Sequence, residues 1–477
     1  MIGAILIGAI APKNVLTLDN FALPMVDLTA WTFSSPLLAI DAQAETGSLV
    51  LAGVLLSLVI IYLAAKLGGE LCARINLPAV LGELVGGVLV GVSAFNLLIF
   101  PDSSGAFHSL ILDFLQATAG LAPEAIPSVG GSISEVISLL SELGVIILLF
   151  EIGLQSNLKE LIQVGQQAAV VAIVGVAVPF AAGTTGLIFL FGVPAIPAIF
   201  AGAALTATSI GITAKVLAEL QRLSSREGQI IIGAAVLDDV LGIIVLAVVA
   251  SLAKTGEIQV GNVIYLIVGA SVFLIGSIFL GRLLSPYFVV LVDRLQTRGN
   301  LLLSSLIFAF VLSYIGAVIH LEAILGAFAA GLILAETDKQ KELEEQILPI
   351  ADMLVPIFFV VVGARTDVSV LNPFVPSNQE GLIIASFLVL VAIVGKVVTG
   401  LGVFGQPGIN KLAIGVGMIP RGEVGLVFAG VGSTTGILDK SLNAAIIVMV
   451  IVTTFIAPPL LRIVFDQAEE KLEETKL

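Results

Sequence analysis

Long apolar stretches alternate along the chain with short segments that carry most of its polar and charged residues. A helix of about 20 apolar residues is long enough to cross the hydrocarbon core of a bilayer. The pattern therefore predicts an all-α polytopic membrane protein with about thirteen transmembrane helices. We expect these helices at residues 48–67, 77–100, 134–154, 165–191, 195–219, 228–252, 261–283, 300–319, 322–335, 347–363, 381–404, 409–434 and 441–465.

Three segments of this pattern need a separate interpretation. The range 322–335 is short for a transmembrane helix, and a re-entrant segment is the alternative. Residues 1–47 contain no complete span, so we interpret them as an extramembrane N-terminal arm. A cleaved signal peptide is the alternative for this arm, because the Ala-Gln-Ala motif at 42–44 resembles a signal-peptidase site. Residues 466–477 form a short acidic tail.

The lysine and arginine residues test the predicted topology, because the cytoplasmic loops of membrane proteins carry an excess of them. With the N-terminus outside, most of the 21 basic residues fall on one side. The other side receives only Lys13, Lys254, Arg365 and Lys440. This distribution supports an N-terminus outside or in a lumen and a cytosolic C-terminus. Lys396 and Arg421 remain inside the membrane, where both need partners.

The order of the predicted helices permits an inverted repeat, a common architecture among transporters, in which spans two to six match spans nine to thirteen. The fifth and twelfth spans then correspond. The fifth has a polar interruption at Thr206, Thr208 and Ser209, and the twelfth contains Pro420 and Gly422, which disfavour a helix. We expect two discontinuous helices, whose freed backbone groups line a cavity or are buried in protein. Hydroxyl back-bonding within an unbroken fifth helix is the alternative.

Composition excludes several other classes of protein. Charged residues make up 12% of the chain and the mean hydropathy is +1.13, so the chain is not a soluble domain. The acidic residues behind the net charge of −14 are spread among loops and tails, and no basic patch indicates nucleic-acid binding. The single cysteine, Cys72, cannot form an internal disulfide or a cysteine-based metal site. We expect no cofactor, and contact with membrane lipid.

The sixth predicted span carries two adjacent carboxylates, Asp238 and Asp239, midway along its apolar run. A charge at the centre of a bilayer costs about 2.5 to 3.5 kcal/mol on insertion scales, so an intramembrane acid indicates a functional site. Neighbouring residues on a helix point about 100° apart. One carboxylate can therefore face an ion path while the other faces a fixed partner.

Five ionisable residues lie near mid-membrane: Asp238, Asp239, Lys396, Arg421 and Glu423. Three carboxylates and two cationic groups leave a net charge of −1 when all are ionised. One proton or one monovalent cation neutralises such a site, so each tends to displace the other. The two aspartates should titrate as a coupled unit. This charge balance predicts the exchange of a cation for a proton.

At these residues the sequence resembles the monovalent cation:proton antiporter-2 family, which includes the Nap-type sodium/proton antiporters. The resemblance extends over about residues 49–465. It is carried by TATSIGI at 206–212, LDDVLG at 237–242, the lysine within VAIVGKVV at 391–398, and MIPRGEVGL at 418–426. The match is closest to cyanobacterial members. Unlike Kef-type potassium relatives, the chain has an aspartate pair and ends soon after its last span.

The resemblance implies roles for individual residues. Asp239 would bind the transported cation, with Asp238 and Thr206 as further Na⁺ ligands, and Asp238 would pair with Lys396. The residues that would line the crossing of two broken helices are Thr206, Thr208 and Ser209. Supporting roles are expected for Pro420, Arg421 and Glu423.

The resemblance also implies an architecture and a cellular role. A core domain, drawn in part from residues 134–252 and 347–465, would slide against a dimerisation domain, drawn in part from residues 48–100 and 261–335. The protein would be a homodimer that exchanges Na⁺ for H⁺ by alternating access and serves pH homeostasis. The bacterial inner membrane and the cyanobacterial thylakoid membrane are the expected locations.

Other functions are alternatives. An intramembrane aspartyl protease would need its two carboxylates to face each other across a cleft, which adjacent positions on one helix do not allow. We therefore expect no enzymatic activity. A K⁺/H⁺ antiporter, a Na⁺-coupled symporter and a channel of related fold remain open. The lysine at mid-membrane favours proton exchange over a symporter that uses only sodium.

Overall fold

The computed structural model describes residues 36–101, 105–255, 260–404 and 408–474. By its contacts the chain divides into two units, Met1–Gly47 and Ser48–Leu477. Most of the predicted N-terminal arm lies outside the described residues, but its last part, with the Ala-Gln-Ala motif at 42–44, belongs to a helix that begins at Pro36.

The described residues form helices and no β-strand; an isolated bridge joins Pro101 and Phe107. Nine of the described helices are long and apolar enough to cross a membrane. These candidate spans overlap or coincide with α1 (Pro36–Arg74), α4 (Ile126–Gln155), α6 (Gly165–Phe191), α9 (Arg226–Thr255), α10 (Val260–Arg294), α11 (Asn300–Val318), α13 (Gln340–Ala364), α14 (Pro376–Val397) and α17 (Lys440–Glu474). The predicted all-α membrane fold is confirmed.

Shorter helices account for the remaining predicted spans. The second and ninth spans are the short helices α2 (Ala79–Val90) and α12 (Ala323–Leu334). The fifth and twelfth spans are each divided in two, as α7 (Ala195–Ala204) with α8 (Ile210–Glu219) and α15 (Lys411–Gly417) with α16 (Glu423–Thr434). The prediction of two discontinuous helices is therefore confirmed. Hydropathy did not predict α3 (Leu110–Ala119), α5 (Leu158–Gln163) or the 3₁₀ turns η1 (Pro123–Ala125), η2 (Val368–Leu371) and η3 (Val398–Gly402).

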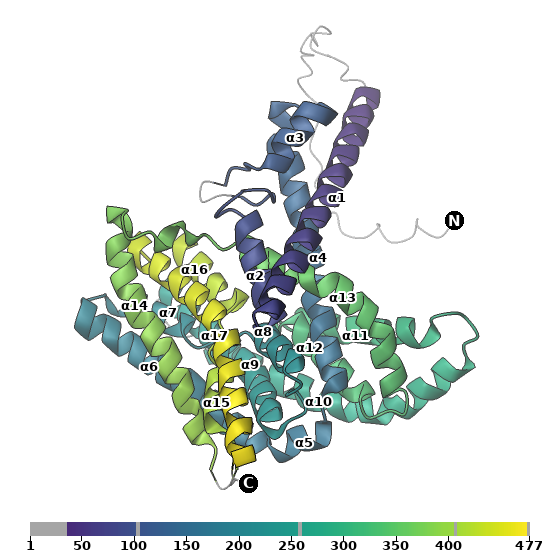
Figure 1. Cartoon of the computed structure of the whole chain (residues 1–477), viewed down its shortest axis with the longest axis vertical. Helices are drawn as coiled ribbons and strands as arrows, with labels where there is room; N and C mark the ends of the chain where they lie inside the picture. Colours follow the sequence, from purple (N-terminus) through teal and green to yellow (C-terminus); the bar gives the residue numbers. More distant parts are fainter. Residues whose placement is uncertain (1–35, 102–104, 256–259, 405–407, 475–477) are drawn as a thin grey trace, which may run out of the picture. The chain divides into compact units, whose positions relative to one another are not determined.

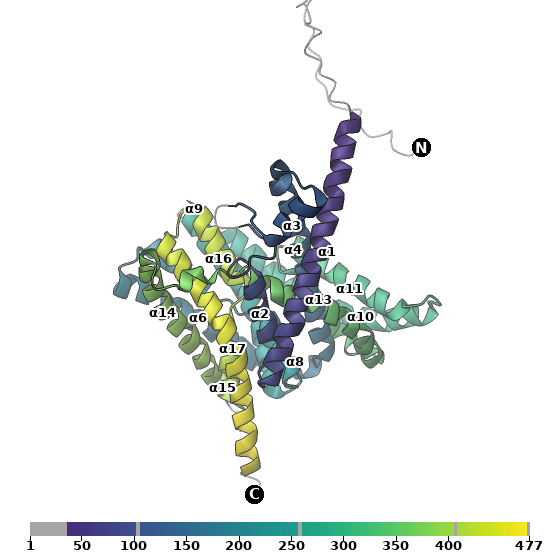
Figure 2. The ribbon, with the colours of Figure 1, turned by 45° about the horizontal axis from the view of Figure 1, so that its top comes forward.

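The helices pack in two groups (Figures 1 and 2). In the first group α6 packs on α7, α9 and α14, and α14 packs on α17. In the second group α4 packs on both α12 and α13, α12 packs on α11, and α13 packs on α2. The broken helices belong to the first group, where α16 contacts α7 and α17. The second group combines helices of both predicted domains, since α4 and α13 were expected in the core domain and α2 and α12 in the dimerisation domain. The division into core and dimerisation domains stays a prediction.

Small residues allow the helices of the second group to approach closely, as is usual in membranes. A Cβ atom added at Gly331 of α12 would lie 2.2 Å from the carbonyl oxygen of Phe150 on α4. One added at Gly153 of α4 would lie 2.4 Å from the carbonyl oxygen of Phe328 on α12. Backbone therefore meets backbone at this crossing, and α4 and α12 are held together.

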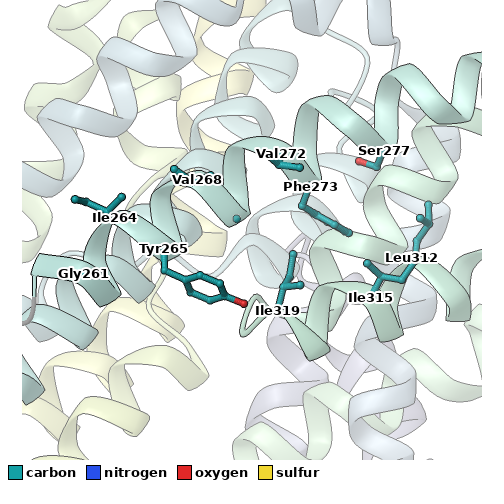
Figure 3. Close-up of a pocket in the computed structure, with 11 residues that line it drawn as sticks. Gly261, Ile264, Tyr265, Val268, Val272, Phe273, Ser277, Leu312, Ile315 and Ile319 are labelled. Atoms are coloured by element: carbon teal, nitrogen blue, oxygen red, sulfur yellow. The ribbon is translucent and has the colours of Figure 1, made fainter.

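A groove of about 700 Å³ runs between α10 and α11 (Figure 3). Apolar side chains such as Val272, Phe273 and Ile315 line it, and the polar groups at its surface are Tyr265 and Ser277. None of the intramembrane carboxylates contributes to its lining. The groove is therefore distinct from the site of the predicted ion chemistry.

Candidate functional site

The two broken helices meet at their breaks. The unwound segment after α7 lies against the unwound segment after α15, and the backbone NH of Ser209 donates a 2.8 Å hydrogen bond to the carbonyl of Pro420. The Thr208 hydroxyl donates to the carbonyl of Met418 at 3.2 Å. A Cβ atom at Gly422 would lie 2.6 Å from Ser209 Oγ, so a residue without a side chain is needed for this approach. Residues at one break thus form hydrogen bonds with backbone groups that have no partner within the other broken helix.

Arg421 stabilises the break in the opposite helix. Its side chain is fully buried, and its Nη1 donates to the carbonyls of Thr206 at 3.2 Å and Ala207 at 2.5 Å. These carbonyls follow the C-terminal end of α7, where the helix dipole is negative. The hydroxyl of Thr454 on α17 donates in turn to the carbonyl of Arg421. The positive guanidinium therefore offsets the negative partial charge at the C-terminal end of α7, inside the membrane.

The first of the two aspartates forms an ion pair. Lys396 Nζ lies 3.2 Å from Oδ1 and 3.1 Å from Oδ2 of Asp238, and both side chains have no solvent-exposed surface. Lys396 is in the last turn of α14, and Asp238 is midway along α9. Gly175 of α6 makes room for the ammonium, because a Cβ atom there would lie 3.1 Å from Nζ. The expected pairing of these two residues is present.

The second aspartate faces the crossing. Asp239 is 4% exposed and lines a cavity of about 10 Å³ together with Thr208, Ser209 and Glu322. Ser209 Oγ is buried, and it neither donates nor accepts a hydrogen bond among the described residues. Carboxylate and hydroxyl oxygens are ligands that hard cations such as Na⁺ accept. The cavity therefore presents oxygen atoms suited to a small monovalent cation.

A sodium/hydrogen exchanger, transmembrane family model matches residues 54–467. The chain belongs to this exchanger family. The resemblance to cation:proton antiporters drawn from the sequence motifs is thereby confirmed, and the exchanger is an integral membrane protein with many membrane-crossing helices.

Individual relatives agree with this assignment. The exchanger is 70% identical over 434 residues to the high-affinity Na⁺/H⁺ antiporter NhaS3 of Synechocystis sp., covering 91% of this chain and 94% of that protein. It is 31% identical to the Na⁺/H⁺-K⁺ antiporter GerN of Bacillus cereus, covering 87% of this chain and 97% of GerN. The sodium proton antiporter MjNhaP1 of Methanocaldococcus jannaschii is similar in fold, with a TM-score of 0.54 at 18% identity, over 90% of this chain and 97% of that one.

Thr206 of the exchanger is placed differently from the other predicted site residues, and the side chain of Glu423 is not described. The Thr206 hydroxyl donates to the carbonyl of Ala203 at 2.8 Å, and Thr206 is absent from the lining of the cavity. Glu423 is the first residue of α16, and its side chain lies outside the described part of the structure. Their roles stay predictions.

Sequence reasoning missed three residues of the site. Glu322 is the first residue of the short predicted span 322–335, and Gly175 and Thr454 carry no motif that would single them out. A carboxylate next to a span too short to cross the bilayer was the available signal for Glu322.

Proposed function

We propose that this protein exchanges Na⁺, or another monovalent cation, for H⁺ by alternating access, with Asp239 as the group that binds either ion. The observation that carries the proposal is the cavity in which Asp239 meets Thr208 and Ser209, beside the ion pair of Asp238 and Lys396. The name of the relative with 70% identity, a Na⁺/H⁺ antiporter, supports sodium as the cation.

The chemistry follows from the charges. The pair of Asp238 and Lys396 is neutral as a unit, so a charged Asp239 keeps one negative charge that a cation or a proton can neutralise. A proton on Asp239 removes the charge that holds the cation, and a bound cation disfavours the proton. Because only one of the two ions is held at a time, moving the site across the membrane in either loaded state exchanges one ion for the other.

The remaining features of the proposal follow the resemblance and the topology. The C-terminus would face the cytosol and the N-terminus the outside or a lumen, in a bacterial inner membrane or a thylakoid membrane. The protein would act as a homodimer in lipid, as a transporter without enzymatic activity or cofactor. Potassium is the second candidate cation, since GerN bears the name of a Na⁺/H⁺-K⁺ antiporter.

The test is transport by the purified protein in liposomes, with an imposed Na⁺ gradient, no other solute, and a fluorescent reading of internal pH. We expect proton movement against the direction of Na⁺ flow. A solute-coupled symporter would not move protons under these conditions, and with the membrane potential clamped to zero a Na⁺ channel would not either. Repeating the measurement with Li⁺ and K⁺ determines the cation preference.

The decisive variant is Asp239→Asn, which should abolish exchange while the protein still inserts and folds, because the amide binds neither a proton nor a cation by charge. Its melting temperature checks folding. The matched control is Asp113→Asn on α3, where the aspartate is exposed, and it should transport like the parent protein. Substantial Na⁺-driven proton flux in Asp239→Asn would contradict the proposal.

A further inference from the structure

A second and larger cavity adjoins the cavity at Asp239. Its volume is about 430 Å³, and we call it the vestibule. It lies between α4, the start of α12, the end of α13 and α16. The charged residues of its lining are Glu142, Glu322 and Arg365.

The vestibule and the cavity at Asp239 share two lining residues, Glu322 and Ile324. The cavity at Asp239, at about 10 Å³, is close to the smallest volume that holds one water molecule. Glu322 and Ile324 therefore lie between the vestibule and the cavity at Asp239. They separate the two cavities where the helix groups meet, because Glu322 precedes α12 and Asp239 is on α9.

The vestibule is a place for water. Glu142 lies within the candidate membrane span Pro123–Gln155 yet is exposed, whereas its neighbour Ser141 is buried. An ionisable residue at this depth faces either a partner or a water-filled cavity rather than lipid. Because Glu142 lines the vestibule, the vestibule is the cavity that this carboxylate borders.

Arg365 is held at the vestibule by several contacts. Its Nη2 donates to the hydroxyl of Ser138, and its Cζ lies 5.1 Å from the centre of the Phe100 ring. Glu142 lies near enough for its charge to act on the Arg365 guanidinium. Two carboxylates against one guanidinium leave the vestibule with a net charge of −1, and a cleft of that sign concentrates cations.

We propose that a cation reaches Asp239 through the vestibule, from the side of the protein where the vestibule lies. Glu322 is the carboxylate that the cation meets before Asp239. The fixed charge of Arg365 limits how strongly the vestibule attracts cations. By the proposed topology this is the side away from the cytosol. The inference rests on the proposed function, and it adds Glu322 and Arg365 as residues that set cation access from one side.

The experiment measures the KM for Na⁺ from each side, in right-side-out and everted membrane vesicles that contain the full chain. Glu322→Gln should raise the KM on the vestibule side by about two- to tenfold, the effect of one charge acting over several ångströms near water. The KM on the opposite side should not change. Arg365→Gln should lower the KM on the vestibule side, and added inert salt should reduce both effects.

The matched control is Glu124→Gln, which removes a carboxylate that is exposed on η1 and absent from the lining of the vestibule. It should change neither KM. Glu322→Asp keeps the charge and should restore most of the affinity. If the Glu322→Gln protein does not fold, as judged by its melting temperature, the KM of Arg365→Gln on the vestibule side tests the inference by itself.

Two results would overturn the inference: an unchanged KM on the vestibule side, or equal changes on both sides. Failure of the proposed function is a different result, because the parent protein would then show no Na⁺-driven proton movement in either vesicle.

Discussion

Asp238 and Lys396 are the two residues whose burial has the largest consequence. Burying either charge alone at this depth would cost free energy of folding. Lys396 Nζ lies within 3.2 Å of the Asp238 carboxylate oxygens, so the two charges compensate each other. Their side chains come from α9 and α14, which also pack on α6. An ion pair without exposed surface joins these helices at the level of the crossing, and its loss leaves an uncompensated charge.

Lys396→Ala should lower the melting temperature of the purified protein, because removing one partner of a buried pair typically costs about 3 to 5 kcal/mol of stability. It should also weaken exchange, since Asp238 without its partner binds protons more strongly. Thermal melting in detergent and the liposome assay measure the two effects.

The control is the surface pair of Lys339 and Asp293, whose nitrogen and oxygen atoms are 3.0 Å apart. Lys339→Ala should leave the melting temperature nearly unchanged, because exposed ion pairs contribute little. The double variant Lys396→Gln with Asp238→Asn should recover much of the stability lost in the single variants. Additive losses in the double variant would show that the two residues do not interact.

At the scale of elements, the crossing of α4 and α12 depends on Gly153 and Gly331. Both face backbone atoms of the other helix rather than flexible side-chain ends. A helix cannot move a carbonyl aside without shifting its whole axis, so a methyl group there must separate the two helices. The same crossing places Glu322, at the start of α12, beside the vestibule residues of α4.

Gly331→Ala should destabilise the protein by about 1 to 3 kcal/mol, the usual cost of overpacking a tight contact. Thermal melting is the measurement. Gly276→Ala is the matched control, because a Cβ atom at Gly276 of α10 meets nothing within 4 Å. Alanine favours a helix over glycine by about 1 kcal/mol, so the control should be neutral or slightly more stable. A stable Gly331→Ala protein would mean that the helices pack less closely than described.

At the scale of the whole molecule, exchange requires that the two ions compete for one site that faces the two sides in turn. The carboxylates of α9 are enclosed by both broken helices and by α14, so the ions share them. Occupation of the site by one ion therefore depends on the concentration of the other.

The apparent affinity for Na⁺ should accordingly fall as the pH falls, because protons compete with the cation for the carboxylates. Binding titrations on the purified protein between about pH 5 and pH 8, a range that spans the pKa values of perturbed carboxylates, measure this dependence. Asp239→Asn should bind Na⁺ weakly at every pH. An affinity that does not change over this range would exclude direct competition.

The sequence by itself determined which segments cross the membrane and where two of them break. Length and apolarity decide the first, because a bilayer demands about 20 apolar residues for each helix. Proline, glycine and clustered hydroxyl residues decide the second, because they act on the local backbone. The need of Lys396 for a carboxylate partner also followed from the sequence, because a buried charge at mid-membrane is costly alone, whereas the choice of Asp238 over Asp239 came from the family resemblance.

Only the tertiary structure decided which side chains share a cavity. The hydroxyl of Thr206 turns back to its own helix, while Thr208 and Ser209 face Pro420 and its neighbours, and nothing in the sequence of the segment separates the three. Glu322 lines the same cavity as Asp239 because the packing of α12 on α4 brings the start of α12 there. Which side chains become neighbours depends on how helices that are far apart in the sequence are rotated and shifted against one another. The hydropathy pattern does not encode that relative position.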